Sequence, residues 1–120
     1  MDKKHVLALG LLPLLALAGY AAHEFFGPEP QTVVVTLTSD GFLPATTTIK
    51  RGDVVRFVGA AERRFWPASD GHPVHSIYPE FDPLRPLQPD EAWEFTFTSR
   101  GEWGYHDHLH SFAKGVIQVE

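Results

Sequence analysis

The sequence predicts an all-β domain, a sandwich or a barrel, and two observations carry this prediction. Short segments rich in β-branched and aromatic residues recur along the chain. Turns rich in glycine, proline and aspartate separate them, and beyond the N-terminal leader no stretch has the pattern of a long helix. Short strands joined by such turns are typical of antiparallel sandwiches and barrels.

Composition narrows the classes of function. The chain has 120 residues, which suits one domain. It has no cysteine, which excludes disulfides, thiolate catalysis, cysteine-bound zinc and iron–sulfur clusters. The net charge is −5 and no basic stripe is present, so nucleic acid is not an expected partner.

A hydrophobic leader precedes the domain. Lys3 and Lys4 are followed by an apolar run over residues 6–17, the layout of a secretory signal. The apolar run as far as residue 22 is also close to the lower length limit for a spanning helix. We therefore expect residues 1–22 to be a signal peptide or a membrane anchor, 23–31 a linker and 32–120 the domain. The expected location is periplasmic or extracellular, or on the outer face of the cytoplasmic membrane.

Period-two alternation and β-branched runs give the expected strands. They cover residues 32–38, 54–58, 75–78, 93–97, 103–107 and 115–119. The fourth segment of this series is followed by one in which Tyr105 and Asp107 share one face. His106 and His108 then lie on the other face. The segment between residues 60 and 90 is otherwise rich in loop residues, and a loop of that length usually has a function.

Histidines gather in two short stretches of the sequence. His106, His108 and His110 surround Asp107, while His72 and His75 lie in the long loop. Imidazole and carboxylate groups are ligands for Cu(II) and Zn(II), so this grouping favours a metal site over chance clustering. Glu80 and Asp82 in the loop are expected to be solvated, with a role as oxygen ligands as the alternative.

Several motifs, taken in order, resemble the cupredoxin family. They are Phe42-x-Pro44, Ile49-x-x-Gly52-Asp53-x-Val55-x-Phe57, His75-Ser76-Ile77, Gly101-x-Trp103-x-Tyr105-x-Asp107-x-x-His110 and Lys114-Gly115-x-Ile117-x-Val119. The resemblance implies a Greek-key β-sandwich with a metal site at one end. It places His75 and His110 at the two histidine ligand positions of the family. Asp107 falls at the cysteine position and Ala113 near the methionine position.

These two replacements change the expected chemistry. A blue copper site needs a thiolate, so the resemblance here implies a non-blue site for Cu(II), with zinc as the alternative. Asp107 is expected either to bind the metal or to orient an imidazole. His72 is the first candidate for a further ligand and His108 the second. His106 and His108 are either solvated surface residues or, by similarity to multicopper oxidases and copper nitrite reductases, part of a site between subunits.

The function expected from these features is copper binding, storage or delivery outside the cytoplasm, with a copper-handling or redox protein as a possible partner. Two alternatives stay open. One is a copper-dependent redox enzyme with a site at an oligomer interface, and the other is a metal-free interaction domain. The sequence shows no recognisable catalytic motif, so no catalytic residues are expected.

Overall fold

The structure is a computed structural model that describes residues 27–71 and 75–120. Within these two ranges the chain forms strands joined by turns and contains no helix that could cross a membrane. The strands are β1 (Thr32–Thr38), β2 (Gly41–Leu43), β3 (Thr46–Ile49), β4 (Val54–Gly59), β5 (Pro67–Ser69), β6 (Ala92–Thr96), β7 (Gly101–Asp107) and β8 (His110–Val119). The all-β prediction is confirmed. The predicted leader and His72 lie outside the described residues.

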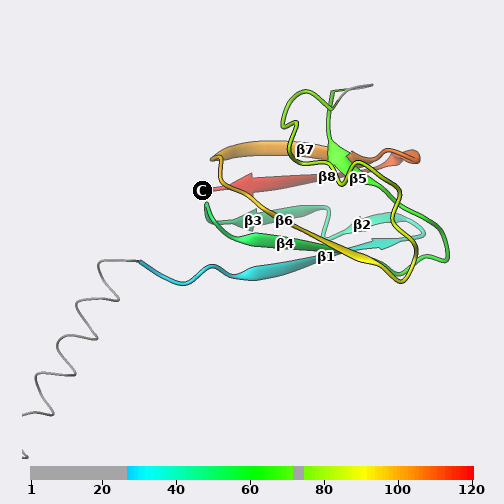
Figure 1. Cartoon of the computed structure of the whole chain (residues 1–120), viewed down its shortest axis with the longest axis horizontal. Helices are drawn as coiled ribbons and strands as arrows, with labels where there is room; N and C mark the ends of the chain where they lie inside the picture. Colours follow the sequence, from blue (N-terminus) through cyan, green and yellow to red (C-terminus); the bar gives the residue numbers. More distant parts are fainter. Residues whose placement is uncertain (1–26, 72–74) are drawn as a thin grey trace, which may run out of the picture.

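Two four-stranded sheets form the sandwich, and Figure 1 shows them as two layers, with β7 and β8 in one and β1 and β4 in the other. One sheet has the order β2-β1-β4-β6 and the other the order β3-β8-β7-β5. The sheets are mixed, because β1 pairs in parallel with β4 and β3 in parallel with β8. The connections therefore cross between the layers, and segments distant in sequence meet in one core.

Aromatic residues fill the space between the sheets. Phe57 from β4, Phe81 from the long loop and Tyr105 from β7 are all buried. Their ring centroids lie 5.4–5.5 Å apart, within the range of favourable aromatic pairs. The segment after β5 is thus anchored in the core by Phe81, although its sequence has the composition of an open loop.

Five of the predicted strands are present, and the prediction for residues 75–78 is wrong. That segment consists of turns and bends, and the strand of this region is β5, which lies earlier in the chain. The reason is local: Gly71 has φ 99° and His75 has φ 50°, and left-handed residues turn the chain out of an extended course. The short strands β2 and β3, on either side of Pro44, were not predicted.

The register of β7 with β8 defines two opposite ends of the sandwich. Gly101 pairs with Val119 at one end, and Asp107 pairs with His110 at the other. The first end also holds the turn before β4, because the Arg51 N–H donates to the Glu120 carbonyl. The chain enters β1 at this first end, and the histidines predicted as ligands lie at the second.

Candidate metal centre

Three histidines converge where the long loop meets β7. His75 comes from the loop after β5, His106 from β7, and His108 from the turn that follows β7. One nitrogen from each ring lies within 4.8 Å of the other two, and His75 Nε2 is 3.0 Å from His108 Nδ1. Metal–imidazole bonds of about 2.0–2.1 Å hold nitrogens up to about 4.2 Å apart, so small side-chain shifts would bring all three onto one ion.

Carboxylates stand behind two of these rings. Asp82 Oδ2 lies 2.8 Å from His75 Nδ1, and Asp70 Oδ1 lies 2.9 Å from His106 Nδ1. A carboxylate accepts a proton bond from Nδ1–H, which fixes the tautomer with its lone pair on Nε2. This pattern is typical of histidines that bind metal ions.

The electrostatics of Asp82 agree with this role. Burial alone would raise the pKa of its carboxyl group, but hydrogen bonds from His75 and Trp66 outweigh burial and hold the pKa below its ordinary value. The side chain is only 9% exposed. The expectation that Asp82 is solvated is therefore wrong.

Backbone strain is concentrated on the same loop. Among the described residues, the non-glycine residues with positive φ are His75 at 50° and Leu84 at 63°. His75 is 4% exposed, and the Leu84 N–H donates to Asp82 Oδ1 over 2.8 Å. Such conformations are unfavourable for residues other than glycine and cluster at functional sites. The strain indicates that the loop is shaped to hold the imidazole of His75.

A glycine makes room for the carboxylate behind His106. A Cβ at Gly104 would collide with Asp70 Oδ2, so only glycine lets this carboxylate lie over β7. The Asp70 N–H also donates to the Gly104 carbonyl over 3.0 Å. Gly104 and His106 are two residues apart on one face of β7, so the pair is part of how this strand presents its histidine.

A second polar cluster lies on the opposite face of β7, around Asp107. This residue is 0% exposed. Its Oδ1 accepts hydrogen bonds from the backbone N–H groups of Trp66 (2.9 Å) and Leu109 (3.1 Å). Its Oδ2 lies 3.0 Å from Arg63 NH1 and 3.3 Å from His110 Nδ1. Protein donors therefore surround this carboxylate, and a guanidinium already balances its charge.

The comparisons with known proteins bear on fold. No family model matches the chain, and no curated protein matches it. Among solved structures, a reduced amicyanin variant matches at 22% identity with a TM-score of 0.64, over 74% of this chain and 82% of that one. An amicyanin variant in its Cu(I) form matches at 24% identity with a TM-score of 0.63, over the same shares of each chain. The chain has a cupredoxin fold.

A copper-containing nitrite reductase from Thermus scotoductus SA-01 matches as well, at 27% identity and a TM-score of 0.62. The alignment covers 78% of this chain and only 23% of the reductase, so the chain corresponds to less than a quarter of that enzyme. The cupredoxin fold and the three clustered histidines together fit a copper-binding, cupredoxin-like protein.

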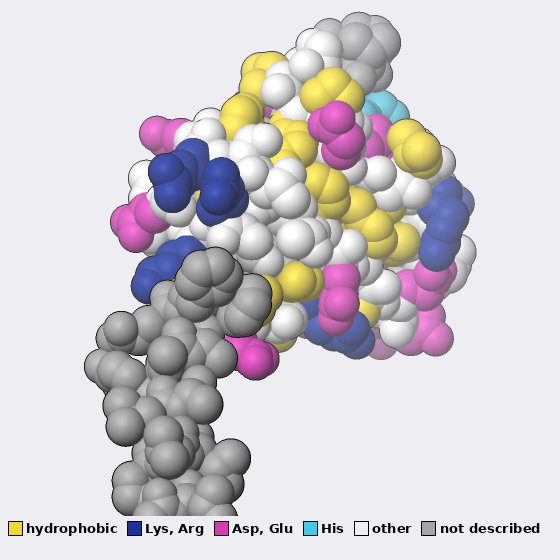
Figure 2. Space-filling view, turned by 60° about the vertical axis from the view of Figure 1, so that its left-hand side comes forward, with side chains coloured by type: hydrophobic (Ala, Val, Ile, Leu, Met, Phe, Trp, Pro, Cys, Tyr) yellow, Lys and Arg dark blue, Asp and Glu magenta, His cyan; other side chains and the backbone are white. Residues whose placement is uncertain are grey.

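The structure separates the residues that the cupredoxin resemblance grouped. His75 lies with His106 and His108, whereas Asp107 and His110 belong to the second cluster. The interpretation of His106 as a solvated surface residue is wrong, because it is 3% exposed. Figure 2 accordingly shows only a small histidine surface on the face it displays, beside acidic side chains. Metal binding by any of these residues stays a prediction.

Sequence reasoning missed four residues that support the two clusters, namely Arg63, Trp66, Asp70 and Gly104. Charged and glycine residues in a loop-rich segment have the same appearance in sequence whether they are solvated or structural. The spacing Gly104-x-His106 was the one available signal, because a glycine inside a strand often marks the close approach of another group.

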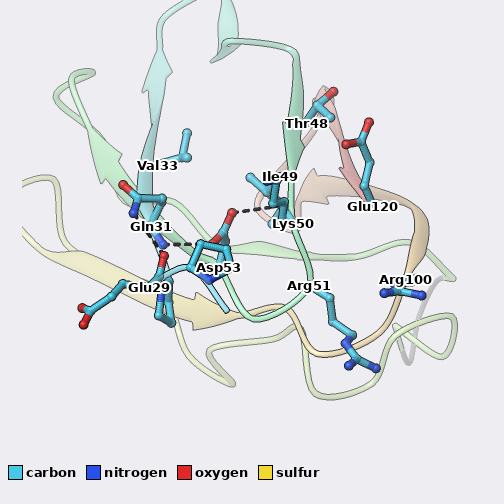
Figure 3. Close-up of a pocket in the computed structure, with 12 residues that line it drawn as sticks. Glu29, Gln31, Val33, Thr48, Ile49, Lys50, Arg51, Asp53, Arg100 and Glu120 are labelled. Atoms are coloured by element: carbon cyan, nitrogen blue, oxygen red, sulfur yellow. Dashed lines mark hydrogen bonds between the residues drawn. The ribbon is translucent and has the colours of Figure 1, made fainter. Parts of the chain in front are cut away.

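A surface pocket of about 770 Å³ lies at the end of the sandwich away from the histidines. Figure 3 shows Asp53 in its wall, where the carboxylate accepts hydrogen bonds from the backbone N–H groups of Gln31 and Lys50, both 2.9 Å. These bonds, from Gln31 first and Lys50 second, hold the pKa of Asp53 below its ordinary value. They tie the entry of β1 to the turn before β4, which is a structural role.

Proposed function

We propose that this protein binds copper as Cu(II) through His75, His106 and His108. The observation that carries the proposal is the convergence of three imidazole nitrogens within 4.8 Å, two of them from rings whose other nitrogen meets a carboxylate. Carboxylate partners of this kind orient ligand imidazoles and raise their basicity, which favours a divalent ion.

The donor set favours Cu(II) in a non-blue site. The chain has no cysteine, and its single methionine is residue 1, so no thiolate is available to form a blue centre. The 3.0 Å separation of the His75 and His108 nitrogens corresponds to about a right angle at the metal. A tetrahedral zinc site would space them at about 3.3–3.4 Å. Among common divalent ions, Cu²⁺ also binds nitrogen sites most tightly.

The three histidines belong to one chain, so this proposal does not need the subunit interface that was the alternative for His106 and His108. Three protein ligands leave at least one position for water or a small ligand. The role we propose is copper binding for storage or delivery. The predicted leader supports a location outside the cytoplasm, and N-terminal sequencing of protein from cell fractions tests that part.

Copper titration of the purified protein, followed by electron paramagnetic resonance, tests the site. We expect one tightly bound Cu(II), pale in colour, with nitrogen couplings from three imidazoles. His106→Ala should lose one nitrogen coupling and more than about 100-fold in affinity, beyond the range for loss of an orienting partner. His110→Ala is the matched control and should bind as the parent does. Loss of copper in His110→Ala with retention in His106→Ala would contradict the proposal.

A further inference from the structure

Trp66 contacts both sides of the proposed copper site. Its indole Nε1–H donates to Asp82 Oδ1 over 2.7 Å, and the other oxygen of that carboxylate meets His75 Nδ1 at 2.8 Å. The Leu84 N–H donates to the same Oδ1. With one oxygen held by two donors, the carboxylate cannot rotate freely, and its second oxygen fixes the plane of the His75 ring.

The same residue also fixes His108. The indole and imidazole centroids lie 4.6 Å apart at an interplanar angle of 54°. The Trp66 carbonyl accepts a hydrogen bond of 2.8 Å from the His108 N–H, and the Trp66 N–H donates to Asp107 Oδ1. The turn after β7 is thus held against Trp66 through backbone and side chain together.

We propose that Trp66 is the positioning residue that sets the distance between the His75 and His108 nitrogens in the copper site. It acts on His75 through Asp82 and on His108 by ring contact. His106 is oriented separately, by Asp70. The inference rests on the proposed copper function and goes beyond it, because it assigns half of the site geometry to a residue that is not a ligand.

This division of the site predicts a pattern of coupling between substitutions. Trp66→Phe keeps an aromatic ring beside His108 and removes only the donor to Asp82. We expect it to lower Cu(II) affinity by about tenfold, the lower end of the range for loss of an orienting partner. In the Asp82→Ala background it should cost almost nothing further, because both changes break one chain of contacts. In the Asp70→Ala background its full effect should persist.

Copper titrations of these single and double variants decide the question, with the melting temperature of the metal-free protein measured for each. Trp93→Phe is the control, because its indole stacks on Phe57 at 5.8 Å and has no contact with the histidines; its affinity should equal that of the parent. Unchanged affinity in Trp66→Phe, or equal losses in the Asp82→Ala and Asp70→Ala backgrounds, would overturn the inference. Failure of the parent protein to bind copper would instead overturn the proposed function itself.

A second measurement leaves Trp66 in place. The double variant Trp93→Phe/Trp103→Phe retains Trp66 as its sole indole. Because that indole contacts the His108 ring, bound Cu(II) should quench nearly all of its fluorescence, with an end point at one equivalent. Persistent emission from copper-loaded protein would show that Trp66 does not lie beside the metal and would overturn the inference.

Discussion

The two faces of β7 carry two polar clusters that are built in opposite ways. On one face, His106 joins two other histidines, and carboxylates lie behind the rings. On the other face, two backbone N–H groups, a guanidinium and an imidazole surround the carboxylate of Asp107. The first cluster directs lone pairs toward a common point, and the second directs donors toward one. A cation fits the first, whereas Arg63 already provides the positive charge in the second.

This comparison explains the consequence of replacing the family's cysteine. The position implied for the sulfur ligand now holds the acceptor of a buried ion pair, which stabilises the turn after β7. The metal-binding capacity has moved by one residue along the strand, to the side chain that points the other way.

The largest expected effect is on stability, from Asp107→Ala. Removing the carboxylate leaves Arg63, which is 23% exposed, and two backbone N–H groups without their acceptor. Loss of one partner of a buried pair costs about 3–5 kcal/mol in the free energy of unfolding. Urea denaturation of the metal-free protein measures it. Arg56→Ala, which breaks the exposed pair with Glu94, is the control and should cost less than about 1 kcal/mol. A similar small cost for Asp107→Ala would refute the structural role.

Next in size are the effects of the carboxylates behind the histidines. Asp70→Ala and Asp82→Ala should each lower Cu(II) affinity by about 10–100-fold, because the imidazoles lose their orienting partners. That range corresponds to about 1.4–2.7 kcal/mol of binding free energy. Glu80→Ala removes an exposed carboxylate from the same loop and should change affinity by less than about twofold. Competition titration with a chelator provides the numbers, and equal effects in all three variants would reduce the site to nonspecific acidity.

Two glycines separate the faces by smaller effects. In Gly104→Ala the new methyl group displaces the Asp70 carboxylate, so copper affinity should fall by up to about tenfold while the melting temperature changes little. In Gly115→Ala it meets the buried Tyr105 ring, so stability should fall by about 1–3 kcal/mol, and copper affinity should not change. Thermal denaturation and copper titration on both variants check this, and the reverse pattern would contradict our assignment of the two faces.

The smallest expected effect is none at all, from Asp107→Cys. The substitution restores the family's sulfur at its own position, but His75 lies with the histidines on the other face. We therefore expect the copper-loaded variant to lack the intense blue absorption that thiolate ligation gives. The absorption spectrum is the measurement. A blue variant would show that His75 can reach Asp107's position and would break the distinction between the two faces.

Sequence alone predicted the framework of this arrangement. Runs of β-branched and alternating residues located β1, β4, β6, β7 and β8. The period-two alternation in β7 also separated His106 and His108 from Asp107 correctly, which the two clusters bear out.

The sequence did not show which face His75 would join. That choice depends on the long loop, where Tyr78 and Phe81 enter the core and turn the segment before them toward β7. The contacts that complete each cluster are also remote in sequence: Asp70 and His106 are 36 residues apart, and Arg63 and Asp107 are 44 apart. Local periodicity carries no information about partners at that range.

The two ends of the sandwich give the molecule a polarity. The chain enters β1 at the end where Gly101 pairs with Val119, and the histidines lie where Asp107 pairs with His110. The seven residues of β7 span about 20 Å between these ends. A protein tethered by its N-terminus would therefore hold its cargo at the far tip, with the length of the sandwich as a spacer. A recipient molecule could approach that tip from the aqueous side, with the tether behind the domain and out of its path.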